Sequence, residues 1–311
     1  MKTGEISKEE FVAFPAEEIA RIVKQKGKPK VGIFVPDGNR RMTMALTGLS
    51  EDAEDFYSEY VRLFTEEFMG NLTVFFSHGL DTLIVPLISP TILNRSQKYI
   101  KLAINGLLQA LVKSDKWLNF YKENDIRVRT YGDREPLKRT QSQKGNPWIE
   151  EIKTQTLHHK THTLFYGFLS NNTGGMESIN LALEFYKLHR RKPTCLEMKE
   201  MYYGENLAEA DFFIMSTKIA GAGALPPFIS GKKTQMYFLL APGVVGLTRE
   251  TFREILYDLL YCRIDETIKK YSVHDLKDIE VLKKLYFSDK SIVLGPGERV
   301  GKFWVPNINT L

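Results

Sequence analysis

Apolar, β-branched runs alternate along the chain with stretches in which apolar residues recur at helical spacing. The runs predict six strands, at Val31–Val35, Thr82–Ile88, Ile126–Tyr131, Thr163–Leu169, Phe212–Met215 and Gln235–Leu240. The helical spacing predicts helices over Tyr57–Phe76, Gln97–Tyr121, Met176–His189 and Arg249–Tyr261. Because strands and helices alternate, we expect an α/β fold with a central, mostly parallel sheet and helices on both faces.

The chain has 311 residues, of which 43% are apolar, and this is enough for one large α/β domain. We predict a single domain over residues 1–311. Residues 139–160 are polar and rich in Lys, Gln and Thr, so we expect an exposed insertion there rather than a linker. From residue 247 onward we expect a helical C-terminal tail.

The charge pattern excludes one class of partner. The net charge of +5 comes from 43 basic and 38 acidic residues that are interspersed, which favours solubility rather than nucleic acid binding. The N-terminal residues are too charged for a signal peptide, and no apolar run has the length of a membrane span. We therefore expect a cytoplasmic protein, with contact to a membrane surface left open.

The segment Lys30–Met42 carries the strongest chemical signal. Its apolar strand ends in Pro36-Asp37-Gly38, and Asn39-Arg40-Arg41 follow. Arginine forks match phosphate oxygens, a glycine lets the backbone come close, and a carboxylate can hold a cation or stabilise a cationic centre. In an open parallel sheet ligands lie beyond the carboxyl ends of strands, where this turn is expected. The segment predicts phosphate chemistry.

Three segments in the same order resemble the cis-prenyltransferase (undecaprenyl diphosphate synthase) superfamily. They are the turn after the first strand, Ile126–Arg134 and Asn172–Ile179. The first motif of that family reads DGNxRW and holds the diphosphate of an allylic isoprenoid. Four residues match it and Met42 replaces its aromatic residue; the matches are Asp37, Gly38, Asn39 and Arg41. The resemblance implies that fold, and a diphosphate site to which Arg40 also contributes.

The departures from the family narrow this expectation. Arg95 is retained from the second motif as a diphosphate contact. The two arginines that hold isopentenyl diphosphate in the family correspond to Ser216 and Ala222, and Gln235 stands where the family has a magnesium-binding Glu. A diphosphate stripped of its guanidinium partners would be desolvated without compensation, so elongation with isopentenyl diphosphate is not expected.

This pattern of retained and lost motif residues is similar to that of one branch of the superfamily, the tuberculosinol and tuberculosinyl-adenosine synthases. These enzymes act on a preformed cyclic diterpene diphosphate. When a gap is allowed in the loop Thr43–Asp55, which is longer here, Tyr60 and Tyr99 match two tyrosines of that branch's site. The resemblance gives Asp37, Tyr60 and Tyr99 catalytic roles.

The resemblance implies an enzyme that ionises an allylic terpenyl, in particular a diterpenyl, diphosphate and passes the cation to water or a nucleoside. Asp37 would act as a base, as a carboxylate near the cation, or as a ligand for Mg²⁺, and Tyr60 would orient or deprotonate the nucleophile. The family also implies a homodimer, for which the aromatic helix around Tyr257 and Tyr261 is one candidate interface.

Other interpretations stay open at this point. Asp37 could be only a turn former, Arg95 a surface residue at the start of a helix, and Tyr60 and Tyr99 core aromatics. Two other functions also compete, namely chain elongation with isopentenyl diphosphate held by other residues, such as Lys218, Lys232 and Lys233, and a non-catalytic partner subunit. Retention of Asp37 beside two arginines argues against the last.

Overall fold

The computed structural model describes residues 6–89, 95–101, 105–132, 145–168, 175–216, 225–231, 233–263, 279–280, 283, 297–300 and 303–306. Six parallel strands form one sheet in the order β3-β4-β2-β1-β5-β6. Their bounds are β1 Val31–Val35, β2 Thr82–Ile88, β3 Ile126–Tyr131, β4 His162–Phe168, β5 Phe212–Ser216 and β6 Gln235–Leu239. The predicted fold class is confirmed, and each predicted strand is present to within one residue at either end.

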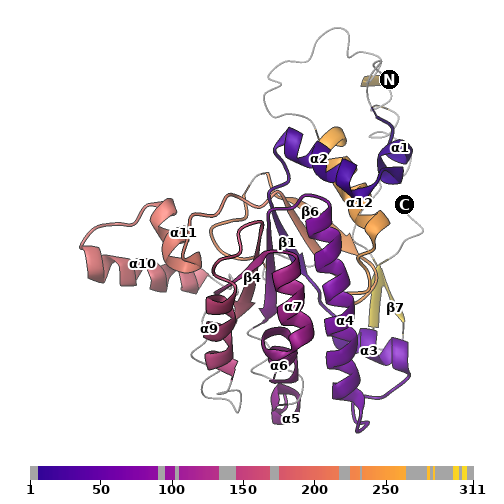
Figure 1. The fold of residues 1–311 in the computed structure, drawn as a ribbon, viewed down its shortest axis with the longest axis horizontal. Coiled ribbons are helices and arrows are strands. Elements are labelled where there is room, and N and C mark those ends of the chain that lie inside the picture. The colour runs from indigo at the N-terminus through magenta and orange to yellow at the C-terminus, as the bar shows by residue number, and fades with distance from the viewer. Residues whose placement is uncertain are drawn as a thin grey trace.

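Helices cover both faces of the sheet because successive strand residues point to opposite sides. Phe34 of β1 joins the larger core under α4 (Phe56–Ser77), α6 (Asn105–Lys113) and α7 (Asp115–Glu123). Ile33 joins the smaller core on the other face, together with Tyr203 of α11 (Cys195–Tyr203). Figure 1 shows α10 (Met176–His189) and α11 extending away to one side of the sheet.

A separate group of helices gathers at one end of the molecule. α1 (Lys8–Ala13), α2 (Ala16–Lys26) and α12 (Arg249–Tyr257) lie together at the top of Figure 1, although α12 is far from the others in sequence. Phe11 of α1 is fully buried against the rings of Tyr257 and Tyr261. These two tyrosines, which the sequence offers as one candidate interface, are half-buried and contact Phe11 within the chain, and the interface stays a prediction.

The predicted helix over Gln97–Tyr121 is interrupted. It consists of α5 (Gln97–Tyr99), α6 and α7, and residues 102–104 lie outside the described part. Ser114 caps the start of α7, and its hydroxyl accepts a hydrogen bond from the backbone N–H of Trp117. A serine in this capping position starts a new helix even where apolar residues continue the pattern of the previous one.

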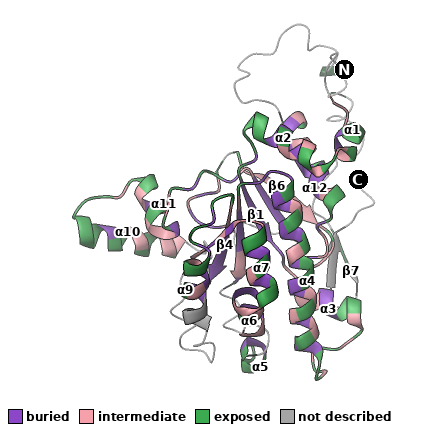
Figure 2. Cartoon of the chain, in the orientation of Figure 1, coloured by how far each residue is buried: buried purple, intermediate pink, exposed green. Residues whose placement is uncertain are grey.

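Residues 139–160 differ from the expected exposed insertion. Residues 139–144 lie outside the described part, but Gly145–Gln155 form α9, whose Ile149 and Ile152 are buried in the larger core. Polar residues dominate this helix on its outer side, and two isoleucines at i and i+3 are enough to anchor it. Figure 2 shows how burial and exposure alternate around the helices that flank the sheet.

The C-terminal part is only partly the helical tail that the sequence predicts. α12 continues into a π-helix at Asp258–Cys262, and an antiparallel pair, β7 (Gly297–Val300) and β8 (Phe303–Pro306), follows later. Within the described residues, the structure has no helix with the length and apolar character needed to traverse a bilayer.

Candidate active site

The turn after β1 is shaped by its own backbone and side chains. Gly38 has φ of 90°, a left-handed conformation that favours glycine, and it caps α3 (Asn39–Thr47). The Asp37 carboxylate accepts a hydrogen bond from the N–H of Gly38 at 2.9 Å, and the Asn39 side chain donates to the carbonyl of Pro36 at 2.6 Å. β1 is the strand at which the chain order reverses, with β2 on one side and β5 on the other. The turn therefore lies where α/β sheets bind ligands.

A second loop holds this turn from the side of β6. The N–H of Gly243 donates to the carbonyl of Asp37 at 2.6 Å, and the hydroxyl of Ser216 donates to the carbonyl of Gly243 at 2.6 Å. Ser216 is fully buried. The position that the family resemblance assigns to an arginine for isopentenyl diphosphate thus carries a buried serine that supports the Asp37 turn through Gly243.

The first turn of α3 has an unusual charge. It contains Arg40 and Arg41 and no acidic residue. Helix N-termini carry a partial positive charge and are stabilised by anions. A phosphate group is such an anion, and backbone N–H groups at a helix start and arginine side chains are groups that bind it.

Arg40 is held on one side and open on the other. Its Nη1 donates to both carboxylate oxygens of Glu51 at 2.9 Å, and the guanidinium lies 5.6 Å from the centre of the Tyr99 ring. Among the described residues, its Nε and Nη2 make no hydrogen bond. Partial burial lowers the pKa of Arg40, but the hydrogen bond and charge of Glu51 outweigh this and raise it, so Arg40 stays cationic.

Tyr60 and Tyr99 lie beside this arginine. Their ring centres are 6.3 Å apart, and Tyr57 of α4 packs edge-on against Tyr99 at 5.9 Å. Burial raises the pKa of Tyr60 well above its usual value, and Tyr99 adds to this; the charges of Arg40 and Asp37 are close enough to act on the same phenol. Tyr60 is therefore a neutral hydroxyl at pH 7, better suited to orient a nucleophile than to deprotonate one.

The other two predicted arginines differ in position. Arg41 is half-buried and follows Arg40 on α3. Arg95 is exposed just before Ser96, which caps α5, and no contact between described residues joins it to the cluster. The structure thus brings together Asp37, Arg40, Tyr60 and Tyr99, with Gly38, Asn39 and Arg41 adjacent in the chain, but it does not bring in Arg95.

The metal prediction has limited support in the geometry. In the part of the chain that the structure describes, no group of three or more His, Cys, Asp or Glu side chains could hold a metal ion. Gln235 lies at the start of β6, in register through Phe212 with Gly32, whereas Asp37 follows the other end of β1. Asp37 and the residue at 235 therefore do not share a ligand set.

Sequence reasoning missed two members of the cluster, Glu51 and Tyr57. The hydroxyl of Tyr57 donates to Glu51 at 3.3 Å. Tyr57 could have been found because it lies three residues before Tyr60, hence on the same face of a helix. Glu51 belongs to a loop, and no periodic pattern signals its contact with Arg40.

The chain is similar in sequence to two known proteins over nearly its full length. No protein-family model matches the sequence. The chain is 30% identical over 297 residues to the tuberculosinyl adenosine transferase of Mycobacterium tuberculosis, covering 94% of this chain and 95% of that protein. It is 24% identical over 308 residues to the (+)-kolavelool synthase of Herpetosiphon aurantiacus, covering 97% of this chain and 96% of that protein.

Two solved structures share the fold at low sequence identity. One is a probable undecaprenyl diphosphate synthase from Campylobacter jejuni, with a TM-score of 0.55, 16% identity, and coverage of 76% of this chain and 98% of that one. The other is lavandulyl diphosphate synthase from Lavandula x intermedia in complex with dimethylallyl diphosphate, with a TM-score of 0.56, 13% identity, and coverage of 76% and 96%. The chain has the fold of these two synthases. It is an enzyme that belongs to the family of tuberculosinyl adenosine transferase.

Proposed function

We propose that the chain ionises an allylic terpenyl diphosphate, in particular a diterpenyl one, and transfers the cation to water or to another nucleophile such as a nucleoside. The observation that carries this proposal is the cluster at the carboxyl end of β1. There one carboxylate, a cationic helix start and two tyrosines meet on residues that are half-buried or buried.

The leaving group is a diphosphate, and its departure needs positive charge. When the allylic C–O bond breaks, both bonding electrons leave with the diphosphate. Gly38 and Asn39 lie at the start of α3, where the helix N-terminus favours an anion, and Arg40 and Arg41 would supply two guanidiniums. Arg95 would join this set only if the diphosphate draws it in from solvent.

The cation that remains is captured by a nucleophile. Water forms a C–O bond and gives an alcohol, and a nucleoside ring nitrogen forms a C–N bond; with water, a proton is released to Asp37 as the base. Tyr60 donates a hydrogen bond that orients the nucleophile, and the electron-rich ring of Tyr99 lies near the developing positive charge.

The names of the two relatives support this choice of chemistry. One is named for transfer of a tuberculosinyl group to adenosine and the other for synthesis of (+)-kolavelool. This chain covers nearly the full length of both. We infer the diterpenyl class from these names, and leave water and a nucleoside as the two acceptors.

We include Mg²⁺ in the proposal, although the geometry of the described residues gives it limited support. Asp37 would hold it together with oxygens of the bound diphosphate, since Mg²⁺ is commonly bound by one or two carboxylates plus substrate phosphates. When bound, the ion would supply further charge for the leaving group. The reaction steps above rest on the protein's own residues.

Chain elongation is the main competing function. It would need a second diphosphate site, for which Lys218 and Lys232 lie outside the described residues and Lys233 is exposed. The buried Ser216, already bonded to Gly243, favours the reaction with one diphosphate. A non-catalytic partner role is disfavoured by the membership in a family of named enzymes.

One experiment separates these functions. The purified chain is incubated with geranyl, farnesyl, geranylgeranyl and bicyclic diterpenyl diphosphates, with and without isopentenyl diphosphate and adenosine, and products and released diphosphate are measured by mass spectrometry and a phosphate assay. We expect diphosphate release without isopentenyl diphosphate, lost in both Asp37→Ala and Arg41→Ala. Chain-lengthened product would overturn the proposal, as would full activity in either variant. Chelation by EDTA in the same assay tests the Mg²⁺ requirement.

Homodimer formation and contact with a membrane surface stay predictions. For a dimer, α10 offers a stripe of exposed apolar side chains, namely Met176, Ile179, Leu183 and Tyr186. Contiguous apolar side chains of this kind on a surface often mark an interaction site.

A further inference from the structure

We infer that Glu51 is a positioning residue for Arg40, holding its guanidinium by Nη1 so that the Nε and Nη2 edge remains open for one diphosphate group. This inference deepens the proposed function, because the ligand that the open edge would bind is the leaving group of that reaction. Glu51 itself would not touch the diphosphate.

The geometry of a guanidinium makes the choice of nitrogen important. Its Nε–H and one Nη2–H are parallel and form the side-on fork that grips two phosphate oxygens. Nη1 is not part of this fork. Both Glu51 oxygens are 2.9 Å from Nη1, while Nε and Nη2 make no hydrogen bond within the described part of the chain. Glu51 therefore fixes the arginine without occupying its fork.

Two aromatic residues also contact the Arg40–Glu51 ion pair. Tyr57 donates to the Glu51 carboxylate at 3.3 Å, so the acid itself has a partner on α4. The Tyr99 ring lies 5.6 Å from the Arg40 guanidinium and supports the cation from a different direction. Arg40 is thus restrained at one nitrogen and on one side, which reduces the freedom that it would lose on binding.

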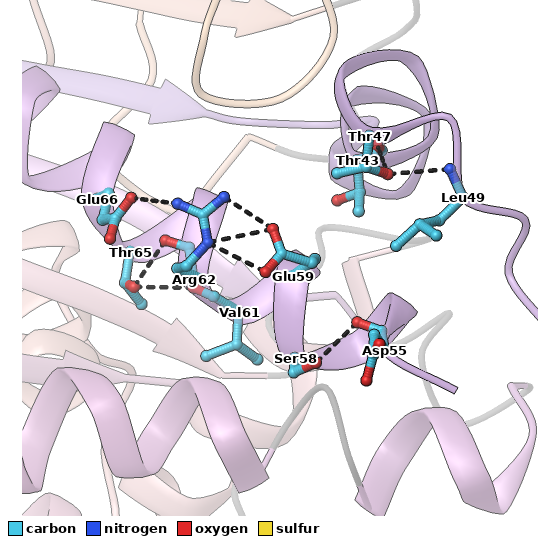
Figure 3. A network of polar contacts seen from close by, with 10 residues as sticks. All are labelled: Thr43, Thr47, Leu49, Asp55, Ser58, Glu59, Val61, Arg62, Thr65 and Glu66. Atoms are coloured by element: carbon cyan, nitrogen blue, oxygen red, sulfur yellow. Dashed lines mark hydrogen bonds and ion pairs between the residues drawn. The ribbon is translucent and has the colours of Figure 1, made fainter. Parts of the chain in front are cut away.

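The loop that carries Glu51 has a defined structure. The sequence suggested one loop over Thr43–Asp55, but α3 extends to Thr47, whose hydroxyl donates to the carbonyl of Thr43 at 2.7 Å and accepts from the N–H of Leu49 at 3.1 Å. Figure 3 shows these contacts together with the Ser58 hydroxyl that donates to the carbonyl of Asp55 where α4 begins. Contacts at both ends therefore fix the loop between α3 and α4, and with it the position of Glu51.

A different role for Glu51 makes the opposite prediction. If the carboxylate only competed with diphosphate for Arg40, its removal would free the arginine and tighten binding. If it positions Arg40, its removal lets the side chain sample other rotamers and weakens binding. The reach of the side chain and its charge can be separated, because Gln keeps the reach without the charge and Asp keeps the charge without the reach.

The test uses inorganic diphosphate as the ligand and the full chain as the protein. Isothermal titration calorimetry gives Kd for wild type, Glu51→Gln, Glu51→Asp, Glu51→Ala and the matched control Glu54→Ala, which removes an exposed carboxylate from the same loop. We expect Glu51→Gln within about twofold of wild type, and Glu51→Asp and Glu51→Ala weaker by about fivefold to tenfold. The control should bind like wild type.

A double-mutant cycle shows whether the effect passes through Arg40. In the Arg40→Ala background, Glu51→Asp should no longer change Kd. Tighter binding in Glu51→Ala and Glu51→Gln would overturn the inference, as would equal Kd values across the series or an undiminished Glu51→Asp effect without Arg40. Thermal melts establish that each variant is folded, and the Gln and Asp variants decide the question if the Ala variant is not.

The two proposals can fail separately. Binding of diphosphate that depends on Arg40 but not on Glu51 would overturn this inference and leave the proposed function intact. The expected Glu51 series, combined with no diphosphate release from any terpenyl diphosphate, would overturn the function and leave the positioning role.

Discussion

Arg40 and Arg62 are both paired with glutamates, yet their geometries differ in the feature that matters for binding an anion. Arg62 donates from Nε and Nη2 to Glu59, with the shorter contact at 2.7 Å, and from Nη1 to Glu66 at 2.7 Å. Figure 3 shows this network, which fills the fork of Arg62. Arg40 is held through Nη1 only, and its fork is open.

The two arginines also differ in how far their side chains are exposed to solvent. The Arg62 side chain is 49% exposed on the outer surface of α4, whereas that of Arg40 is 30% exposed at the start of a helix and beside tyrosine rings. Exposed ion pairs are screened by water and contribute little. The comparison shows that an ion pair can either occupy the Nε and Nη2 donors of an arginine or leave them open to bind an anion. Which of the two occurs depends on the nitrogen that the carboxylate engages.

The largest expected difference is in turnover after removal of each arginine. Arg40→Ala should lower kcat/KM for the terpenyl diphosphate by about 100-fold or more, because a preorganised donor to the leaving group is lost. Arg62→Ala is the matched control and should stay within about twofold, with a stability change of roughly 0.5 kcal/mol or less. Steady-state diphosphate release and urea denaturation measure both. Equal losses of kcat/KM in the two variants would contradict the difference that we infer between Arg40 and Arg62.

A third arginine extends the comparison to a pair whose partner is uncharged. Arg253 Nε donates to Nε2 of the buried His78 at 3.0 Å, and His78 Nδ1 donates to the carbonyl of Val74 at 2.8 Å. Burial, reinforced by the Arg253 charge, lowers the pKa of His78 from 6.5 to about 4. The folded protein therefore favours the neutral ring, while the unfolded chain takes up a proton near pH 6.5.

This pair predicts a dependence of stability on pH. Its contribution is fully present above about pH 6.5 and is lost as the pH falls towards 4, by up to about 3 kcal/mol in the free energy of unfolding. Urea denaturation at pH 7, 6 and 5 measures the slope. In His78→Leu the slope over this window should become shallower, and an unchanged slope would assign the pH dependence to other groups.

The smallest expected effect is on kcat, after a change in one of the tyrosines that lie near Arg40 but not near Arg62. Tyr60→Phe removes a neutral hydroxyl and keeps the ring, so kcat should fall by about tenfold through lost orientation of the nucleophile. Because burial raises the pKa of Tyr60 well above its usual value, the wild-type rate should show no rise assignable to its ionisation between pH 7 and 9. A rate that climbs over that range in wild type but not in Tyr60→Phe would make Tyr60 a base.

The sheet was predictable from sequence because its strands are short apolar runs with clear ends. β1 and β2 have the predicted bounds, and the Asp37–Arg41 turn follows β1 directly, so its position at the edge of the sheet is a local consequence of the pattern. Tyr60 and Tyr99 could be placed only through a family resemblance, since both also fit a helical core. Their neighbourhood with Arg40 is a tertiary property.

The remaining features depend on contacts that no local pattern contains. α9 was expected to be exposed because its polar residues outnumber Ile149 and Ile152, which nevertheless anchor it in the core. Glu51 was missed because its contact with Arg40 crosses a loop that has neither strand nor helix spacing. The role of Ser216 depends on its hydrogen bond to the carbonyl of Gly243, which is 27 residues away in the chain.

The hydrogen bond between Gly243 and Asp37 also implies an order in which parts of the site form during synthesis of the chain. A nascent chain can form β1 and the start of α3 early, since these segments are contiguous. The carbonyl of Asp37 receives its donor only after the loop beyond β6 has been synthesised and β5 and β6 have joined the edge of the sheet next to β1. A ribosome-bound fragment that ends before this loop would hold every reactive side chain of the cluster, and yet the turn that carries Asp37 would still lack the clamp that holds it.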